Sequence, residues 1–327
     1  MDINAITREI PSLHTDSIFI NSIKENIVSF VRMMRQVNAV IIKNRVFNMK
    51  IEWKEDENGR ISPVTDADIQ ANNIICEFLN IYSRNVMSEN AITISEENKD
   101  IPFEERNKIE LDAIWVVDPL DGTSSYINYD VERGEFVDDG FTVNIARLEK
   151  RQKINEDGSI TLYWKPIFGI ISTPTDNMVY FGSEGIGSYI CTPDNSMLPF
   201  GMRYPHKSDK DFNEIIAKRP VRVGVSASHC NEQTSTLITD LFGNNYESFS
   251  SGSSMKFINV FLGKTDFYPR LGMTMEWDIC AAVAIGESCG YNIKVYSSPI
   301  VRSGKFEDLD SVTFNKEDLS NPYFIVY

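Results

Sequence analysis

Two aspartates three residues apart stand at the end of an apolar run, in the stretch Ile114-Trp115-Val116-Val117-Asp118-Pro119-Leu120-Asp121-Gly122-Thr123. The β-branched and aromatic residues before Asp118 predict a buried strand. Pro119 restricts the backbone and Gly122 admits conformations that other residues avoid, so we expect one tight turn here. Such a turn could hold divalent cations between its carboxylates. A solvated turn without any ligand explains the same residues equally well, because this composition is common in turns.

The composition of the whole chain limits the class of protein. For 327 residues one or two domains are expected, and 42% hydrophobic with 24% charged residues is ordinary for a globular protein. The net charge of −15 argues against a nucleic-acid partner or an anionic membrane surface, since proteins that bind these have basic faces. The same charge would repel an anionic substrate, so a metal cluster or local cations would have to attract it.

Cysteines and histidines do not form a recognisable site. The five cysteines lack CxxC spacing and the three histidines lack zinc-type spacing, which indicates free thiols in a reducing compartment. The N-terminal residues do not have the pattern of a signal peptide, and no apolar run reaches the roughly 18 residues of a membrane-spanning helix. We therefore expect a cytoplasmic protein that does not insert into membranes.

Apolar periodicity predicts two long helices in the first part of the chain, over 17–43 and over 69–79. The second would begin at Thr65 or Asp66. Asp68 would then lie in its first turn, where the helix macrodipole alone explains an acid without any catalytic role. Strands are expected at 92–97, 114–117, 141–146, 167–171 and 178–181.

Strands and helices alternate in the last third of the chain. We expect a strand at 221–225 and helices at 233–242, 255–261 and 279–285. Asp278 taken alone is best explained as an N-cap, and the serine-rich stretch 250–254 offers N–H groups to an anion only as a weak signal. These elements predict a layered α/β fold with a mixed or antiparallel sheet and a domain boundary near residue 200.

Four acids each end an apolar element, and such ends cluster on one face of layered α/β folds. Carboxylate oxygens without nearby histidine or cysteine favour Mg²⁺ or Mn²⁺ over zinc. Bound cations would also make an acidic protein attractive to phosphate. The residues therefore indicate Mg²⁺-dependent phosphoryl transfer or hydrolysis. The four acids are Glu96, Asp118, Asp121 and Asp278.

The chain resembles the inositol monophosphatase superfamily in three ordered blocks: Ser95-Glu96-Glu97, Asp118-Pro119-Leu120-Asp121-Gly122-Thr123, and Trp277-Asp278 followed by Ala281. Further segments resemble its 3′(2′),5′-bisphosphate nucleotidase branch, the bacterial CysQ-type enzymes. The resemblance covers roughly residues 50 to 327. The branch-specific segments are 62–65, 141–146, 252–257, 268–272 and 321–324.

The resemblance implies a layered αβαβα sandwich. Residues 1–200 would form an α+β domain with an antiparallel sheet and most of the metal ligands. Residues 201–327 would form an α/β domain with a mixed sheet, the nucleotide-binding residues and the last metal ligand.

The resemblance also implies a two-metal site. One Mg²⁺ is expected on Glu96, Asp118 and the main-chain carbonyl of Leu120. A second is expected on Asp118, Asp121 and Asp278, so that Asp118 bridges both ions. Mn²⁺ is the alternative ion.

The same resemblance implies roles for other residues around this site. Asp68 and Thr123 are expected to orient and deprotonate the attacking water, and the N–H groups of Gly122 and Thr123 to bind phosphate oxygens. Glu97 is expected to support the metal site or to hold a weaker third ion.

Four residues match positions that contact the nucleotide and its second phosphate in this branch: His229, Ser253, Lys256 and Arg270. Lys256 follows Ser253 by one helical turn, and Arg270 offers a bidentate fork for phosphate. Each has an alternative as a cap or surface charge, and for His229 alone that alternative is the better one.

Two departures from the branch concern the substrate. Ala227 stands where an arginine is usual, and the segment 128–140 is longer and more acidic than usual. This segment follows the metal-binding stretch closely enough to alter substrate entry. Its acids are Asp130, Glu132, Glu135, Asp138 and Asp139.

The implied reaction is hydrolysis of adenosine 3′,5′-bisphosphate to AMP and phosphate, a step of sulfur metabolism, with the sulfate-carrying analogue as a second substrate. Lithium inhibition is expected from the superfamily. The rivals are an inositol monophosphatase or a broader sugar-phosphate phosphatase and, from another class, a catalytically inactive metal or nucleotide sensor. The expected partner is a small phosphorylated nucleotide, and the expected state is a monomer or homodimer.

Overall fold

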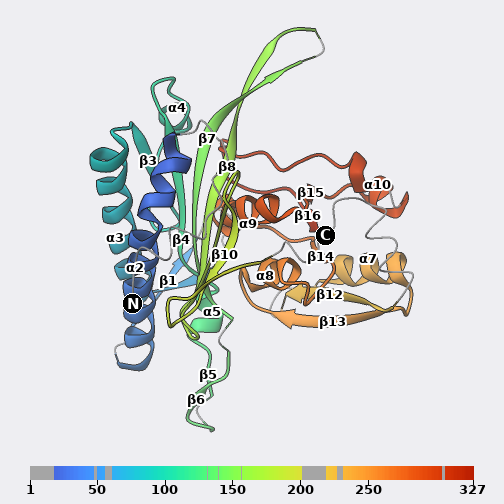
Figure 1. Ribbon diagram of the computed structural model, residues 1–327. Coiled ribbons are helices and arrows are strands. Elements are labelled where there is room, and N and C mark those ends of the chain that lie inside the picture. The colour runs from blue at the N-terminus through green and yellow to red at the C-terminus, as the bar shows by residue number, and fades with distance from the viewer. Residues whose placement is uncertain are drawn as a thin grey trace.

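Alternating layers of helices and sheets build the protein, as the computed structural model shows (Figure 1). The structure describes residues 18–47, 50–55, 61–130, 132–138, 140–155, 157–200, 219–226, 231–303 and 306–327.

Two long helices form the first outer layer, α2 (Ile18–Phe47) and α3 (Asp66–Ile81). The prediction of a helix over 17–43 is confirmed, with four more residues at its end. Phe30 of α2 is fully buried, and its ring centroid lies 5.6 Å from that of Phe168 in the neighbouring sheet. The apolar faces of both helices are thus buried against one face of the sheet.

The largest layer is a seven-stranded sheet with the strand order β11-β10-β9-β8-β7-β4-β3. β3 and β4 are parallel while the other neighbours are antiparallel, so the sheet is mixed at one edge. Because β3 and β4 run in the same direction, their carboxyl ends lie side by side. The strands are β3 (Ala91–Ser95), β4 (Ala113–Asp121), β7 (Thr142–Ile154), β8 (Ile160–Thr173), β9 (Met178–Ser183), β10 (Gly187–Cys191) and β11 (Met197–Pro199).

The central layer contains α8 (Met255–Phe261) and α9 (Glu276–Cys289), which lie between the two sheets in Figure 1. The backbone of α9 packs directly on the large sheet. A Cβ built at Gly169 of β8 would lie 2.2 Å from the carbonyl oxygen of Ala281, so only glycine allows this approach. The contact holds α9, and with it Asp278, against the strands.

The second sheet separates the central layer from the outer helix α7. Along β16, Phe324 and Val326 pack with the α8 and α9 residues, whereas Ile325 packs with Leu237 of α7. A parallel bridge between Val223 and Phe267 joins its two strand groups. The elements are β12 (Val221–Ser226), α7 (Glu232–Phe242), β13 (Tyr246–Ser251), β14 (Tyr268–Arg270), β15 (Ile293–Val295), α10 (Ser298–Ser303) and β16 (Phe324–Val326).

Short elements complete the described chain. They are β1 (Ile51–Glu55), β2 (Ile61–Thr65), the π-helix η1 (Tyr82–Met87), α4 (Phe103–Arg106), α5 (Thr123–Tyr126), β5 (Tyr129–Asp130), β6 (Glu135–Phe136) and the 3₁₀ helix η2 (Phe306–Asp308).

The order of layers confirms the predicted layered α/β sandwich. The predicted division into 1–200 and 201–327 stays a prediction, because it adjoins 201–218, which lie outside the described residues. α9 comes from the second half of the chain and packs on the sheet of the first, so the two halves share a core. Within the described ranges, no helix is both long and apolar enough to cross a membrane.

Gly169→Ala tests the close packing of α9 on the sheet. The added Cβ would collide with the main chain of Ala281, which cannot rotate away, so we expect the free energy of unfolding to fall by roughly 1–3 kcal/mol. Urea unfolding followed by circular dichroism measures it. The matched control is Gly224→Ala in β12, where the nearest atom to a built Cβ is 3.6 Å away. An equal loss at both positions would contradict the prediction.

Candidate active site

β4 ends in a bulge that brings two aspartates to the same side. Its pairing with β7 is regular as far as Asp118 and Asn144, and it resumes one residue out of register at Asp121 and Thr142. Residues three apart on a regular strand point to opposite faces, and the extra residue of a bulge cancels this alternation. Pro119, which has no N–H for the ladder, lies in the bulge. The carboxylates of Asp118 and Asp121 can therefore converge.

We predicted a single tight turn over 118–123, and this prediction is wrong about where the turn begins. The strand continues to Asp121, and the chain leaves it at Gly122, whose φ of +91° lies in the left-handed region. The short helix α5 starts directly afterwards with Thr123. Both aspartates thus belong to a hydrogen-bonded strand rather than to a loop, because pairing with β7 continues past Pro119.

Asp278 in the first turn of α9 joins these two aspartates. One carboxylate oxygen from each of Asp118, Asp121 and Asp278 lies within 4.8 Å of the others. Asp118 is buried and the other two are half-buried. Oxygen donors at this spacing suit Mg²⁺ or Mn²⁺. The structure brings together the three predicted ligands of the second ion.

Glu96 directly follows β3 and is half-buried. Its N–H donates a hydrogen bond to the carbonyl oxygen of Val117 (3.1 Å), which ties the ends of β3 and β4 together. Burial, and next the negative charge of Asp278, raise the pKa of Glu96 to about 8. Glu96 thus shares an electrostatic environment with the three aspartates, although it is not one of the group within 4.8 Å.

Burial and mutual repulsion also affect the aspartates. The pKa of Asp118 lies well above its usual range, because the group is buried and Glu96 and Asp121 are near. Burial, and then Asp121, raise the pKa of Asp278 to about 7. A bound divalent cation would neutralise this repulsion, so the donor set fits the metal that the sequence predicts.

Sequence reasoning missed three residues that hold Asp121. Its Oδ2 accepts hydrogen bonds from Thr142 Oγ1 (3.3 Å), Asn144 Nδ2 (3.3 Å) and Ser254 Oγ (3.1 Å). Thr142 and Asn144 lie two residues apart, on one face of the strand, in the otherwise apolar run 141–146, and that pattern could have indicated them. Ser254 has no such signal, since a serine at a helix start is ordinary.

The position of Asp278 in the sequence suggested that it is the N-cap of its helix, and this prediction is wrong. α9 begins at Glu276 with Met275 as the N-cap, and Asp278 is the third helical residue. Its Oδ2 accepts a hydrogen bond from the N–H of Met275 (2.8 Å), which orients the carboxylate.

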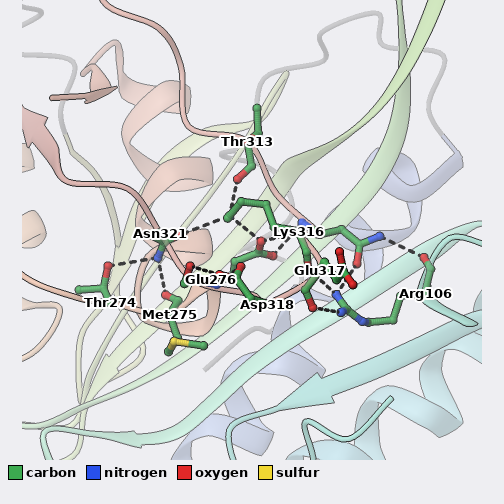
Figure 2. Close-up of polar contacts among 11 residues, drawn as sticks. Arg106, Thr274, Met275, Glu276, Thr313, Lys316, Glu317, Asp318 and Asn321 are labelled. Carbon is green, nitrogen blue, oxygen red and sulfur yellow. Dashed lines mark hydrogen bonds and ion pairs between the residues drawn. The ribbon is translucent and has the colours of Figure 1, made fainter. Parts of the chain in front are cut away.

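A buried polar network binds the start of α9 (Figure 2). Glu276 is fully buried and accepts hydrogen bonds from the N–H groups of Asn315 (2.8 Å) and Lys316 (2.9 Å) and from Lys316 Nζ (2.6 Å). Arg106 of α4 donates to the carbonyl oxygens of Lys316 (2.9 Å) and Glu317 (2.8 Å). The helix start that carries Asp278 is therefore tied to both halves of the chain.

The predicted dyad of Asp68 and Thr123 is brought together. Thr123 Oγ1 lies 3.3 Å from Asp68 Oδ1 and 3.1 Å from the carbonyl oxygen of Leu120. Asp68 Oδ2 accepts hydrogen bonds from the N–H (2.8 Å) and hydroxyl (2.6 Å) of Thr65, which is the N-cap of α3. Burial nevertheless raises the pKa of Asp68 to about 6. A carboxylate with this pKa can take a proton near neutral pH.

Glu97 already has a cation beside it. Its Oε2 lies 2.5 Å from Nζ of Lys54 on β1, and its side chain is only 3% exposed. This ion pair links β1, which pairs with β2, to the residues that follow β3.

A second group of predicted residues lies beside the acids. Lys256 is buried, and its Nζ donates to the carbonyl oxygen of Ser253 (2.6 Å). Burial lowers the pKa of Lys256 to about 8 although Asp121 and Asp278 oppose the shift. Among the described residues, Ser253 Oγ and Arg270 Nε have no hydrogen-bond partner although both atoms are buried. Each of these atoms lacks a partner that a ligand or a water molecule would supply.

The nucleotide-binding prediction for His229 lies outside the described residues, as does Ala227, because the structure does not describe 227–230. Gly122 and Thr123 are described at the start of α5, next to the aspartates.

The model of the Inositol monophosphatase family matches residues 24–310. This chain belongs to that family. Among curated members, the 3′(2′),5′-bisphosphate nucleotidase CysQ of Haemophilus influenzae is 30% identical over 278 residues, which cover 84% of this chain and 82% of that protein. The CysQ of Escherichia coli K12 is 31% identical over 234 residues, covering 71% and 76%.

Solved structures agree with this assignment. The crystal structure of CysQ from Bacteroides thetaiotaomicron is similar with a TM-score of 0.62 and 28% identity, over 91% of this chain and 96% of that chain. An IMPase/NADP phosphatase complexed with Mg²⁺ and phosphate shares the fold, with a TM-score of 0.59 and 15% identity over 94% and 91%.

Asp118→Asn should stabilise the protein in EDTA. The raised pKa of Asp118 means that its charge is unfavourable at pH 7 without a cation, and asparagine removes that charge. We expect Tm to rise, by about 2–4 °C for each kcal/mol of repulsion released. Mg²⁺ should then raise Tm in the wild type more than in the variant. Calorimetry with EDTA and with Mg²⁺ measures both.

The control for this measurement is Asp100→Asn, since Asp100 is an exposed acid. It should change neither Tm nor the effect of Mg²⁺. A lower Tm for Asp118→Asn in EDTA would show that repulsion among these carboxylates does not limit stability.

Proposed function

We propose that this protein is a Mg²⁺-dependent phosphomonoesterase that hydrolyses adenosine 3′,5′-bisphosphate to AMP and phosphate. The sulfate-carrying analogue is the second candidate substrate, yielding adenosine phosphosulfate. The observation that carries the proposal is the pair of buried, unpartnered polar atoms, Ser253 Oγ and Arg270 Nε, near Lys256 and the acids. A second phosphate would supply their partners. The curated relatives that are about 30% identical are named for this substrate class.

Mg²⁺ in this site would be held by Asp118, Asp121 and Asp278, whose oxygens lie within 4.8 Å of one another. Glu96 and the carbonyl oxygen of Leu120 would complete the ligands of a neighbouring ion. When bound, such ions supply positive charge that activates water and stabilises the leaving oxygen. Two or three ions, with Mn²⁺ as the alternative, are proposed. The structural neighbour solved with Mg²⁺ and phosphate has the same fold.

The residues of the chain itself position water and phosphate. Thr123 Oγ1, 3.3 Å from Asp68 Oδ1, would orient the attacking water, and Asp68 would receive the proton. The N–H groups of Gly122 and Thr123, where β4 passes into α5, would bind the oxygens of the reacting phosphate.

Cations near the acids would offset the repulsion between the acidic protein and its anionic substrate. The chain carries a net charge of −15, so a doubly phosphorylated ligand is repelled at long range. Lys256 and Arg270 would attract its second phosphate locally, with His229 as an additional contact. The side chain of Lys256 donates a hydrogen bond to the carbonyl oxygen of Ser253, and that of Arg270 donates one to the carbonyl oxygen of Met273 (3.1 Å).

Two other functions remain alternatives. An inositol monophosphatase or broader sugar-phosphate phosphatase would use the same acids without needing Lys256 and Arg270. A metal or nucleotide sensor would keep the site but release no phosphate. We also propose a cytoplasmic location, inhibition by lithium and a monomeric or homodimeric state.

Phosphate release from a substrate panel tests the proposal. Adenosine 3′,5′-bisphosphate should be hydrolysed with a higher kcat/KM than inositol 1-phosphate or fructose 1,6-bisphosphate, and EDTA should abolish release. Lys256→Met should raise KM for the bisphosphate by about tenfold or more, because a charge-assisted hydrogen bond contributes roughly 1.5–3 kcal/mol. KM for inositol 1-phosphate should change much less.

The matched control is Lys264→Met, which removes an exposed cation from the loop after α8. It should leave both KM values unchanged. Equal changes for both substrates in Lys256→Met would favour a sugar-phosphate phosphatase, and a wild type that releases no phosphate from any substrate would favour the sensor.

Thr123→Ala tests the dyad. Loss of the hydroxyl that orients the water should lower kcat by roughly 10²–10⁴, while the acids that bind Mg²⁺ remain. Steady-state kinetics and calorimetric titration of Mg²⁺ measure the two effects. Ser124→Ala, which changes the adjacent exposed hydroxyl, serves as the control. Full activity in Thr123→Ala would exclude Thr123 from the proton path.

A further inference from the structure

The acidic segment after the metal-binding strand forms a hairpin, which we call the acidic hairpin and define as residues 128–138. Its strands β5 and β6 are antiparallel, and Figure 1 shows them projecting beyond α5, away from the layers. The ring centroids of Tyr129 and Phe136 lie 5.1 Å apart across the two strands. The described acids near its tip, Glu132 and Glu135, are exposed.

Arg45 in the last turn of α2 anchors this hairpin. Only 5% of Arg45 is exposed. Its Nη2 donates to the carbonyl oxygen of Asp138, and its Nε donates to that of Tyr126 (2.9 Å). Its guanidinium carbon lies 4.1 Å from the ring centroid of Phe136 and 4.7 Å from that of Phe141. Only a planar, permanently charged fork can make these contacts together, so lysine is no equivalent.

The anchored end of the hairpin leads into a glycine that touches two parts of the active site. Asp138 Oδ1 accepts a hydrogen bond from the N–H of Gly140 (2.8 Å). A Cβ built at Gly252 would lie 2.2 Å from the carbonyl oxygen of Gly140, and one built at Gly122 would lie 3.0 Å from the same atom. Gly140 therefore packs closely against both the end of β4 and the loop after β13.

That loop carries the unpartnered atom on which the proposed function depends. Gly252 is followed by Ser253, whose φ of +39° is unusual for a residue with a side chain. The carbonyl of Ser253 in turn accepts the hydrogen bond from Lys256. A displacement of Gly140 would therefore shift both Ser253 and Lys256.

We propose that Arg45 is a positioning residue for substrate binding: by anchoring the acidic hairpin, it keeps Gly140 against Gly252 and so holds residues 251–256 ready for the second phosphate. The identity of that ligand rests on the proposed function. The hairpin acts through the backbone contact of Gly140 with Gly252, and the charges at its tip do not contribute to substrate binding.

Arg45→Met tests this role with two readouts. KM for adenosine 3′,5′-bisphosphate should rise by about tenfold, the effect of losing charge-assisted hydrogen bonds. Amide hydrogen exchange at residues 251–256 should become faster. Arg45→Lys should give an intermediate KM. Wild-type exchange at 251–256 in Arg45→Met would overturn the proposal, whatever happens to KM.

Two further variants separate anchoring from charge and from folding. Glu132→Gln removes a tip charge and should keep the wild-type KM, and an increase equal to that of Arg45→Met would overturn the proposal. Gly140→Ala leaves Arg45 in place and pushes on Gly252, since its Cβ would lie 3.0 Å from Cα of Gly252 and 2.9 Å from Oδ1 of Asp138. It should raise KM even if Arg45→Met does not fold, and a wild-type KM would overturn the proposal.

The proposed function and this inference can fail separately. If the wild type does not hydrolyse the bisphosphate, the proposed function fails. The exchange of residues 251–256 in Arg45→Met and Gly140→Ala then decides the inference alone, because this readout needs no turnover.

Discussion

Repulsion among carboxylates that have been removed from water is the constraint on which this structure depends. Burial and neighbouring charges raise the pKa values of Glu96, Asp118 and Asp278, so these groups lie together at an energetic cost in the absence of a cation. The main chain must hold them in place. A bulge in β4 and the network around Glu276 provide this support. This arrangement lowers the stability of the protein when no cation is bound, and a cation placed among the acids would offset that loss.

The same constraint explains how an acidic protein can bind an anion. Cations at the carboxylates would reverse the local charge, and Lys256 and Arg270 add positive charge a short distance away. Lys256 itself is buried, and burial lowers its pKa to about 8, so its charge depends on the acids around it. The acids and the nearby cations therefore stabilise one another electrostatically, and each group would be unfavourable alone.

Close backbone contacts connect the layers that carry these groups. Gly169 lets α9 lie directly on the large sheet, and Gly252 lets its loop lie against Gly140. Neither contact leaves room for a Cβ, so small displacements in one layer are passed on to the next. For this reason a residue as distant in sequence as Arg45 can affect the position of Ser253.

Sequence alone determined the type of chemistry and the longer helices with part of the strands. Carboxylates without histidine or cysteine indicated Mg²⁺, and apolar periodicity predicted α2, α3 and the strands β3, β4, β7, β8, β9 and β12, because both depend on residue type and local spacing. The tertiary structure decided where β4 ends, since a bulge exists only relative to its partner strand. It also decided that Met275 rather than Asp278 caps α9, and that Ser254 holds Asp121. These features depend on hydrogen-bond partners that are far apart in the sequence, and no local pattern encodes them.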